Sequence, residues 1–247
     1  MPLSIFSSKL RQLPKAELHC HLDGSVRPAT LLDLAHEARV QMPKHTAEEL
    51  AEFMRVDDAQ TLEDYLKRFD VTVSVMQSEE ALERIAYELA EDAAEDGVRY
   101  IEVRNAPILN VVQGLTLVQA VEAPLRGLRR AEKDFGITGR FIICALRNFP
   151  AEDSLEMAQL AVEFKNDGVV AFDLAGPEKG NPNARHVAAF KYAREHNLAV
   201  TVHAGEGDGA ESVRQAVHVC GANRIGHGTR LIEEASDKIE ELIGSDE

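Results

Sequence analysis

Glu17-Leu18-His19-Cys20-His21-Leu22-Asp23-Gly24, close to the N-terminus, is the stretch from which the fold and the chemistry of this chain are inferred. In an extended strand, side chains alternate between two faces, so His19 and His21 share one face and Leu18, Cys20 and Leu22 the other. Two imidazoles at this spacing suit a Zn²⁺-like ion, which takes nitrogen ligands at about 2.0–2.1 Å. For this motif alone, two hydrogen-bonded histidines on a half-exposed strand are the simpler interpretation.

Composition narrows the class of protein. The 247 residues, 45% of them hydrophobic, can bury the core of one large domain. Asp and Glu number 42 against 27 Lys and Arg, a net charge of -15 with no basic cluster. Because binding to a phosphate backbone or an anionic lipid surface needs a basic face, neither nucleic acid nor a membrane is expected as a partner.

The cysteines and the N-terminus bear on the compartment. Cys20, Cys144 and Cys220 form no CxxC pair, and we expect them to be reduced, mostly buried thiols. The first residues lack the basic and apolar regions of a signal peptide, and no apolar run approaches the roughly 20 residues of a spanning helix. A cytoplasmic protein is expected.

Helical patterns follow the first strand. A capping residue, a helix-starting proline or apolar residues spaced by three and four mark each of four helices, which together form an insertion at about residues 28–96. The predicted helices are Ala29–Arg39, one opened by Thr46 with Glu49 completing a capping box, Thr61–Met76, and Ser78–Asp96.

Strands and helices then alternate. The predicted strands are Val98–Val103, Arg140–Leu146, Val169–Leu174, Leu198–His203 and Arg224–His227. The predicted helices are Thr116–Asp134, Ser154–Asn166, Ala184–His196, Gly209–Val219 and a charged tail, Ile232–Ile243. Apolar strands between amphipathic helices indicate a parallel sheet covered by helices, hence an α/β fold. With no repeat or linker, residues 1–247 are expected to form a single domain.

The positions of polar residues distinguish a doubly wound sheet from a (β/α)8 TIM-type barrel. His21, Asp173, His203 and His227 each lie at the end of a predicted strand, where barrels gather catalytic groups. No glycine-rich phosphate turn follows the first strand, which disfavours a nucleotide-cofactor fold. The barrel is therefore predicted, but with about six strands of the eight it is expected to be incomplete.

Three strand ends supply a candidate metal site. Catalytic zinc commonly has three protein ligands and an open position for water, and His19, His21 and His203 supply three nitrogens. Such a metal lowers the pKa of its bound water from 15.7 towards about 7. Glu206, between two glycines, is a candidate proton shuttle, and His227 a candidate for holding the water. A solvated loop glutamate and a turn histidine are the simpler interpretations of each alone, but their joint placement favours a site.

With these residues together, the chain resembles the adenosine deaminase family of metal-dependent hydrolases, from about Leu13 to Leu231. The motifs that carry the resemblance are Leu-Pro-Lys-Ala-Glu-Leu-His19-Cys20-His21-Leu-Asp23-Gly24-Ser25, Asp173-Leu174-Ala175-Gly176, Thr-Val-His203-Ala-Gly-Glu206 and Arg-Ile-Gly226-His227-Gly228. The resemblance implies a (β/α)8 barrel with one zinc ion at its mouth, bound by His19, His21 and His203.

The resemblance also implies the reaction and its residues. Glu206 would protonate purine N1, and His227 would orient and deprotonate the attacking water, so that ammonia leaves and adenosine becomes inosine. The substrate, a small purine nucleoside, would contact His21, the Asp23 carboxylate through its ribose 5′-hydroxyl, and the Gly176 backbone through N3. The helical insertion would form a lid, with an apolar wall drawn from Leu62, Tyr65, Leu66 and Phe69; ordinary helix core is the alternative for these four.

Substrate and activity leave alternatives open. Relatives acting on adenine or modified adenine commonly carry Glu or another residue where this chain has Asp23, so adenosine and 2′-deoxyadenosine are favoured over adenine. Another metal-dependent hydrolase, of an amide, lactone or phosphoester, is disfavoured because such enzymes often use a strand lysine and no predicted strand contains one. The Cys-rich zinc signature of cytidine deaminases is absent. The oligomeric state is left open.

One departure from the family pattern stands out. The family has a further Asp ligand in a Ser-x-x-Thr-Asp-Asp-Pro-like stretch, whereas here Asp57-Asp58 is followed by Ala59 within the helical insertion. The chain is therefore expected to be an N-terminal portion that lacks two closing barrel segments. An unclosed barrel exposes edge strands, so a non-catalytic, truncated barrel is the competing hypothesis.

Overall fold

Six strands lie in chain order in the sheet of the computed structural model, which describes residues 9–57 and 59–234. They are β1 (Lys15–His21), β2 (Val98–Asn105), β3 (Thr138–Leu146), β4 (Val169–Ala175), β5 (Ala199–Ala204) and β6 (Arg224–His227). β1 pairs with β2, β4 with β5, and β5 with β6, all in parallel. The strands predicted from sequence and the α/β class are thus confirmed.

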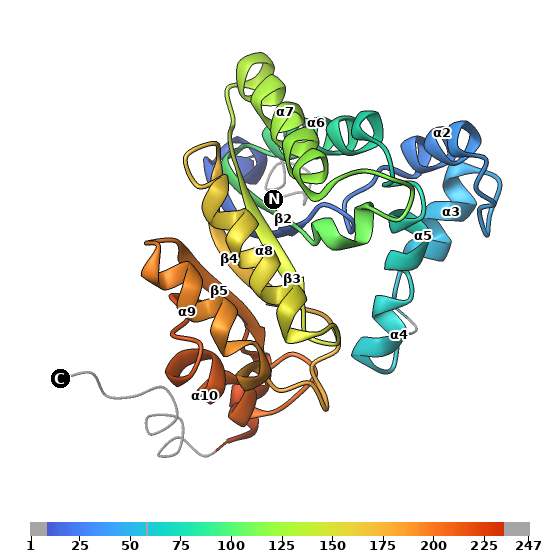
Figure 1. Cartoon of the computed structure of the whole chain (residues 1–247). Coiled ribbons are helices and arrows are strands. Elements are labelled where there is room, and N and C mark those ends of the chain that lie inside the picture. Colours follow the sequence, from blue (N-terminus) through green and yellow to red (C-terminus); the bar gives the residue numbers. More distant parts are fainter. Residues whose placement is uncertain (1–8, 58, 235–247) are drawn as a thin grey trace. The chain divides into compact units, whose positions relative to one another are not determined.

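Helices precede and separate these strands (Figure 1). The α-helices are α2 (Pro28–Ala38), α3 (Ala47–Met54), α4 (Leu62–Leu66), α5 (Phe69–Val73), α6 (Glu79–Glu95), α7 (Leu117–Phe135), α8 (Ala151–Glu163), α9 (Val187–Glu195) and α10 (Ala210–His218). Short 3₁₀ helices are η1 (Pro107–Asn110), η2 (Asn183–His186) and η3 (Thr229–Glu233). Of the predicted helix Ile232–Ile243, the part after Glu234 lies outside the described residues.

Three predicted helices differ from the structure. The predicted helix Ala184–His196 begins as the 3₁₀ helix η2, and α9 starts only at Val187. The single helix Thr61–Met76 is wrong, because α4 and α5 are separate short helices. The interruption falls at residues 67–68, and the amide of Val71 donates to the carbonyl of Arg68, a 3₁₀-type bond. Helix α8 starts at Ala151 instead of Ser154, since Pro150 precedes it and two acidic residues favour its first turn.

The chain divides into two compact units. The N-terminal unit comprises the described residues up to Val56 and Arg68–Phe141, and the C-terminal unit comprises Asp57–Lys67 and the described residues from Ile142 onward. Helix α4 therefore belongs to the C-terminal unit, while α2, α3, α5 and α6 belong to the N-terminal unit. The helical insertion expected after the first strand is present. Its role as a lid and the single domain stay predictions.

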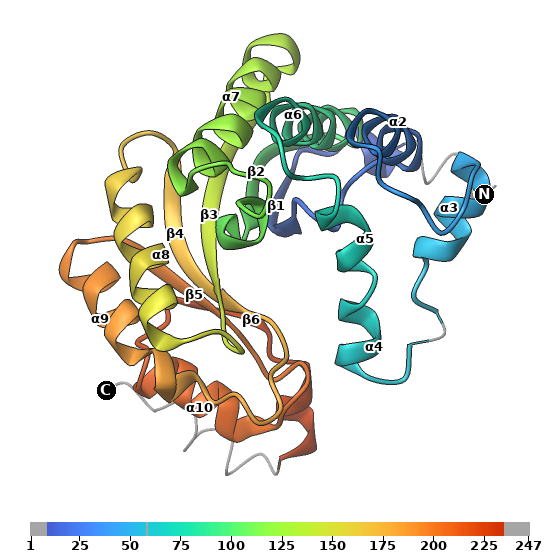
Figure 2. The same cartoon turned by 45° about the vertical axis from the view of Figure 1, so that its right-hand side comes forward.

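In the N-terminal unit, α6 and α7 lie side by side, as both Figure 1 and Figure 2 show. Gly127 in α7 makes this close packing possible, because a Cβ there would lie 2.2 Å from the carbonyl oxygen of Glu83. Glu79 and Glu83 pair with Arg126, and Glu83 also pairs with Arg130. The glycine in mid-helix is therefore a packing requirement.

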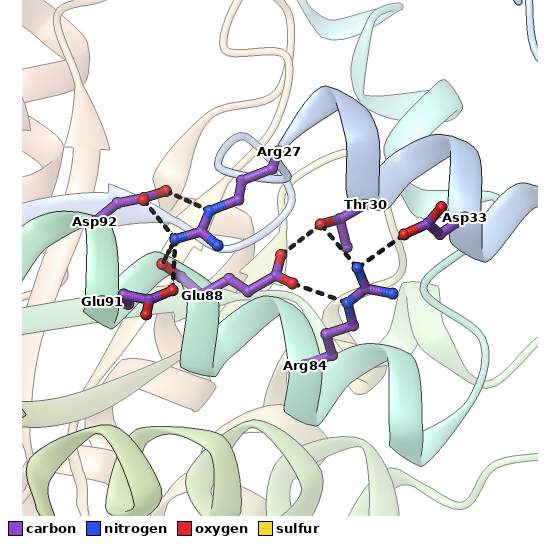
Figure 3. A network of polar contacts seen from close by, with 7 residues as sticks. All are labelled: Arg27, Thr30, Asp33, Arg84, Glu88, Glu91 and Asp92. Carbon is purple, nitrogen blue, oxygen red and sulfur yellow. Dashed lines mark hydrogen bonds and ion pairs between the residues drawn. The ribbon is translucent and has the colours of Figure 1, made fainter. Parts of the chain in front are cut away.

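An ion-pair network joins α2 to α6 (Figure 3). The guanidinium of Arg27 binds both carboxylate oxygens of Asp92 at 3.0 and 2.6 Å and Glu91 at 2.7 Å. Arg84 pairs with Asp33 of α2 and with Glu88, which accepts a bond from the Thr30 hydroxyl. These contacts hold the first helix of the insertion against the longest helix within it.

In the C-terminal unit, α8 and α9 pack together and against the strands that they follow or precede (Figure 2). The rings of Phe172 in β4 and Phe190 in α9 meet edge to face at 5.2 Å, and both are fully buried. Apolar strand residues thus form the core under the helices, and polar residues are placed at the ends of the strands.

Of the three cysteines, all within the described residues, Cys144 and Cys220 are buried and Cys20 is half-buried, as expected for mostly buried thiols. Their reduced state stays a prediction. Among the residues that the structure describes, no helix combines the length and apolar character needed to cross a bilayer.

Candidate functional site

The end of β1 carries two imidazoles that converge. The rings of His19 and His21 have centroids 5.3 Å apart, so these side chains do share one side of the strand as predicted. Asp23 follows, is 8% exposed, and has Oδ1 3.8 Å from Nδ1 of His21. Three of the predicted site residues are therefore neighbours within the N-terminal unit.

A bulge modifies the strand just before these histidines. Glu17 is in register with Ile101 and Cys20 with Val103, so β1 contains one more residue than β2 across this interval. The amide of His19 donates to the carboxylate of Glu17 at 2.9 Å. Leu18 is 41% exposed whereas Leu22 is fully buried, so the residues expected on the face opposite to the histidines differ in burial across the bulge.

Buried polar groups fix the β1 end. The guanidinium of Arg104 donates to the carbonyl of Leu18 at 2.8 Å, and its own carbonyl accepts from Leu22 at 2.9 Å. The hydroxyl of Ser25 donates to the carbonyl of His21 at 2.6 Å. The ring of Phe69 lies edge-on to the ring of His21, with the ring centroids 6.1 Å apart. Phe69 thus places an apolar surface beside that histidine.

In the C-terminal unit, His203 and Asp173 form a buried pair. His203 is 5% exposed and Asp173 is fully buried, and Nδ1 of His203 lies 3.0 Å from Oδ2 of the carboxylate. Oδ1 of Asp173 also accepts the amide of Leu174 at 2.8 Å. A carboxylate on Nδ1 orients the ring and leaves Nε2 as the atom that a metal could use.

Glu206 and His227 face each other. Nε2 of His227 lies 3.4 Å from Oε2 of Glu206, and the rings of His227 and His203 are 5.2 Å apart. Burial raises the pKa of the Glu206 carboxyl above its ordinary value; the charge of His203 opposes this shift and that of Glu178 adds to it. A raised pKa suits a group that donates a proton near neutral pH.

His227 has a left-handed backbone, with φ of 71°. Such a conformation is uncommon for a residue with a Cβ and is often retained at functional positions. The following Gly228 is also left-handed, and its amide donates to the carbonyl of Ala204 at 2.9 Å. The end of β6 is thereby tied to the end of β5, which carries His203.

Two charged residues here were missed from sequence. Glu178 is 3% exposed, and its carboxylate accepts the backbone amides of residues 205–208. Arg147 is fully buried directly after β3 and donates to the carbonyl of His203. A charged residue directly after an apolar strand was a usable signal for Arg147, whereas Glu178 lies in a loop without periodicity.

Gly176 directly follows β4, as expected for a backbone contact near the strand ends. Its φ is 97°, and a Cβ would lie 3.0 Å from the side-chain oxygen of Asn148. Leu62 of α4 lies close to Gly207, where a Cβ would be 2.8 Å from it. The predicted site residues of this unit, which are Gly176, His203, Glu206 and His227, thus lie on or just after three successive strands, together with Asp173.

The sequence of this chain is similar to those of known adenosine deaminases. The family model described as adenosine deaminase matches residues 14–243. An adenosine deaminase of Mycobacterium avium is 44% identical over 233 residues, covering 92% of this chain and 63% of the relative. One from Clostridium botulinum is 42% identical over 219 residues, covering 88% of this chain and 66% of the relative. The chain therefore spans somewhat less than two thirds of the length of these relatives.

Solved structures agree with the fold. An adenine deaminase from Arthrobacter aurescens aligns with a TM-score of 0.83 and 27% identity over 92% of this chain and 67% of its own. An amidohydrolase from Burkholderia ambifaria, solved with bound Zn, aligns with a TM-score of 0.84 and 28% identity, covering 95% of this chain and 64% of its own. An Arabidopsis N6-mAMP deaminase aligns with a TM-score of 0.78 and 28% identity, covering 96% of this chain and 70% of its own. The TIM-type fold predicted from sequence is confirmed.

Proposed function

The chain belongs to the adenosine deaminase family, and on this premise we propose that the protein hydrolyses adenosine and 2′-deoxyadenosine at C6. Water adds to C6 and the amino group leaves as ammonia, which gives inosine or 2′-deoxyinosine. The observation that carries this proposal is the pairing of the half-buried Glu206, whose pKa is raised, with His227, next to the oriented His203.

Zinc is the cofactor that we propose, one ion per chain, with His19, His21 and His203 as its ligands. The donor set fits: the first two rings converge on one side of β1, and Asp173 engages Nδ1 of His203 so that Nε2 remains. The bound Zn in the Burkholderia relative supports this choice of metal. When bound, zinc would supply the Lewis acid that makes water nucleophilic near neutral pH.

The chain's own groups would move the protons. Glu206, whose pKa is raised by burial, donates a proton to purine N1 and so makes C6 more electrophilic. His227 orients the attacking water and takes its proton, and the left-handed backbone holds its ring opposite Glu206. Each group thus has one task, which its position at a strand end permits.

Substrate recognition would rest on Asp23 and Gly176. The buried Asp23 carboxylate, beside His21, is proposed to accept the ribose 5′-hydroxyl, and the Gly176 amide to donate to purine N3. Phe69 beside His21, and Leu62 beside Gly207, would supply apolar walls on their own units. A cytoplasmic location is consistent with three cysteines that are expected to be reduced and a net charge of -15.

Adenine or a modified adenine compound is the second candidate substrate, because structural relatives include an adenine deaminase and an N6-mAMP deaminase. The test measures kcat/KM of the zinc-loaded protein for adenosine, 2′-deoxyadenosine, adenine and N6-methyl-AMP. We expect kcat/KM for adenosine to exceed that for adenine by at least about 100-fold, because adenine has no ribose 5′-hydroxyl for the Asp23 carboxylate to accept. Equal or greater kcat/KM for adenine would reject the nucleoside assignment.

A matched pair of variants refines this test. Asp23→Glu lengthens the carboxylate by one methylene and should lower kcat/KM for adenosine more than for adenine. Asp23→Asn keeps the length and removes the charge, so it separates the effect of reach from that of charge. Identical losses for both substrates in both variants would assign Asp23 a role in folding alone.

A further inference from the structure

The turn that carries Glu206 is held by a buried carboxylate from another loop. Oε1 of Glu178 accepts the amide of Gly205 at 2.7 Å. Its Oε2 accepts the amides of Glu206, Gly207 and Asp208 at 3.0, 2.6 and 2.9 Å. Successive amides that converge on one anion form a backbone nest, and here the anion is a side chain of the same unit.

The charge of Glu178 is maintained although the group is buried. Burial opposes its ionisation, but hydrogen bonds from Ser212 and from the turn amides, together with the charge of Arg147, hold the pKa of Glu178 below its ordinary value. The guanidinium of Arg147 is itself fixed by the carbonyls of His203, Leu174 and Asn181. An ionised acceptor is needed, because three amides share one oxygen.

The opposite side of the turn is bound to the segment after His227. The carbonyl of Gly205 accepts the amide of Arg230 at 2.9 Å and the hydroxyl of Thr229 at 3.0 Å. The carbonyl of Gly207 accepts the guanidinium of Arg230 at 3.0 Å. The backbone on either side of Glu206 is therefore held from two directions, and one of them also holds the turn that follows β6.

We propose that Glu178 is a positioning residue for proton transfer: its carboxylate fixes the 205–208 turn so that the side chain of Glu206 meets His227 in one orientation. The inference rests on the proposed function for its catalytic consequence. The hydrogen-bond geometry is independent of it. Glu178 acts through the backbone amides of the turn.

Glu178→Gln tests the proposal with little change in volume. The amide has one carbonyl acceptor, and its NH₂ group would point N–H donors at the backbone N–H groups, so part of the nest is lost. The matched control is Glu132→Gln in the N-terminal unit, where the carboxylate accepts the amide of Gly139 at 3.0 Å and pairs with Arg140.

The first readout is amide hydrogen exchange of residues 205–208, which requires no turnover. We expect Glu178→Gln to speed exchange there by at least about tenfold while α10 stays protected, and Glu132→Gln to leave the turn unchanged. Unchanged exchange in the turn of Glu178→Gln would overturn the proposal. If that variant does not fold, Ser212→Ala is used instead, because it removes one hydrogen-bond donor to Glu178. It should speed exchange of the same amides by a smaller factor.

The second readout is the kinetics of adenosine hydrolysis. A displaced acid should lower kcat by roughly 100-fold with KM within about threefold, since the turn acts on the reaction more than on substrate binding. A loss confined to KM, or a kcat equal to that of Glu132→Gln, would contradict positioning. If wild-type protein fails to convert adenosine, the proposed function fails, while the exchange experiment still decides whether Glu178 fixes the turn.

Discussion

Nδ1 of His203 lies 3.0 Å from Oδ2 of Asp173 in the interior of the C-terminal unit. The carboxylate is fully buried, and it is also fixed by the amide of Leu174. A histidine held in this way presents Nε2 in a defined direction. Metal-binding imidazoles usually donate their other ring N–H to a carboxylate or carbonyl in this manner. The metal site proposed here therefore depends on Asp173 as well as on the histidines.

Asp173→Asn should weaken zinc binding by about 10- to 100-fold, because the amide holds the ring less firmly and makes it less basic. The measurement is competition for zinc with a chromophoric chelator. Glu152→Gln, at the exposed start of α8, is the control for an added loss of charge. Equal zinc affinity in the wild type and Asp173→Asn would remove His203 from the proposed ligand set.

Gly205→Ala should destabilise the protein by about 2 kcal/mol or more. The residue has φ of 69°, and a Cβ would lie 2.8 Å from Cγ2 of Val213 and 3.1 Å from the Cα of Gly228. Gly209→Ala is the matched control, since its φ is -82° and no atom lies within 4 Å of the added Cβ. Thermal unfolding that gives equal midpoints for the two variants would contradict the packing described for Gly205.

The contribution of Glu178 to stability should depend on pH. Its pKa is lower in the folded protein than its ordinary value of 4.5, so its stabilisation is fully present above about pH 4.5 and is lost as pH falls through the folded value. Glu178→Gln should therefore be less stable than wild type by about 3 kcal/mol at pH 7, with the difference shrinking below about pH 4. Denaturant unfolding across this range gives the comparison, and a pH-independent difference would show that the charge is not what stabilises the turn.

Arg27→Lys should loosen α2 from α6. Lysine cannot bridge Asp92 and Glu91 with the planar fork that Arg27 uses, so we expect a loss of about 1 kcal/mol, or about 2–4 °C in Tm. High salt should reduce the difference between wild type and variant, because the pairs are partly exposed. Lys67→Gln, which removes an exposed pair within α4, should change Tm by less. A larger loss for Lys67→Gln would mean that the network adds nothing to these helices.

The elements that sequence predicted well are those with strong periodicity. The strands that end near His203 and His227 and the long amphipathic helices α6 and α7 follow from apolar spacing and caps alone. The predicted helix Thr61–Met76 illustrates the opposite case, because its apolar spacing is continuous and gives no sign of the interruption at residues 67–68.

Residues that act through tertiary contacts were beyond reach of that reasoning. The bulge at Leu18 depends on the register with β2. Glu178 binds the amides of residues 205–208, which lie 27 or more residues further along the chain. No local pattern in the sequence reports either fact. By contrast, the placement of His19 and His21 on one side of β1 could be predicted, because side chains two residues apart in a strand point to the same face.

The most direct measurement is the rate of conversion of adenosine to inosine by zinc-loaded protein, followed by ultraviolet absorbance, for wild type and Glu206→Gln with the zinc content of both determined. The proposed function predicts turnover by wild type and a loss of at least about 100-fold in the variant at equal zinc content, because the variant cannot donate a proton to N1. Equal rates in the two proteins, or zinc-loaded wild type that leaves adenosine unchanged, would contradict it.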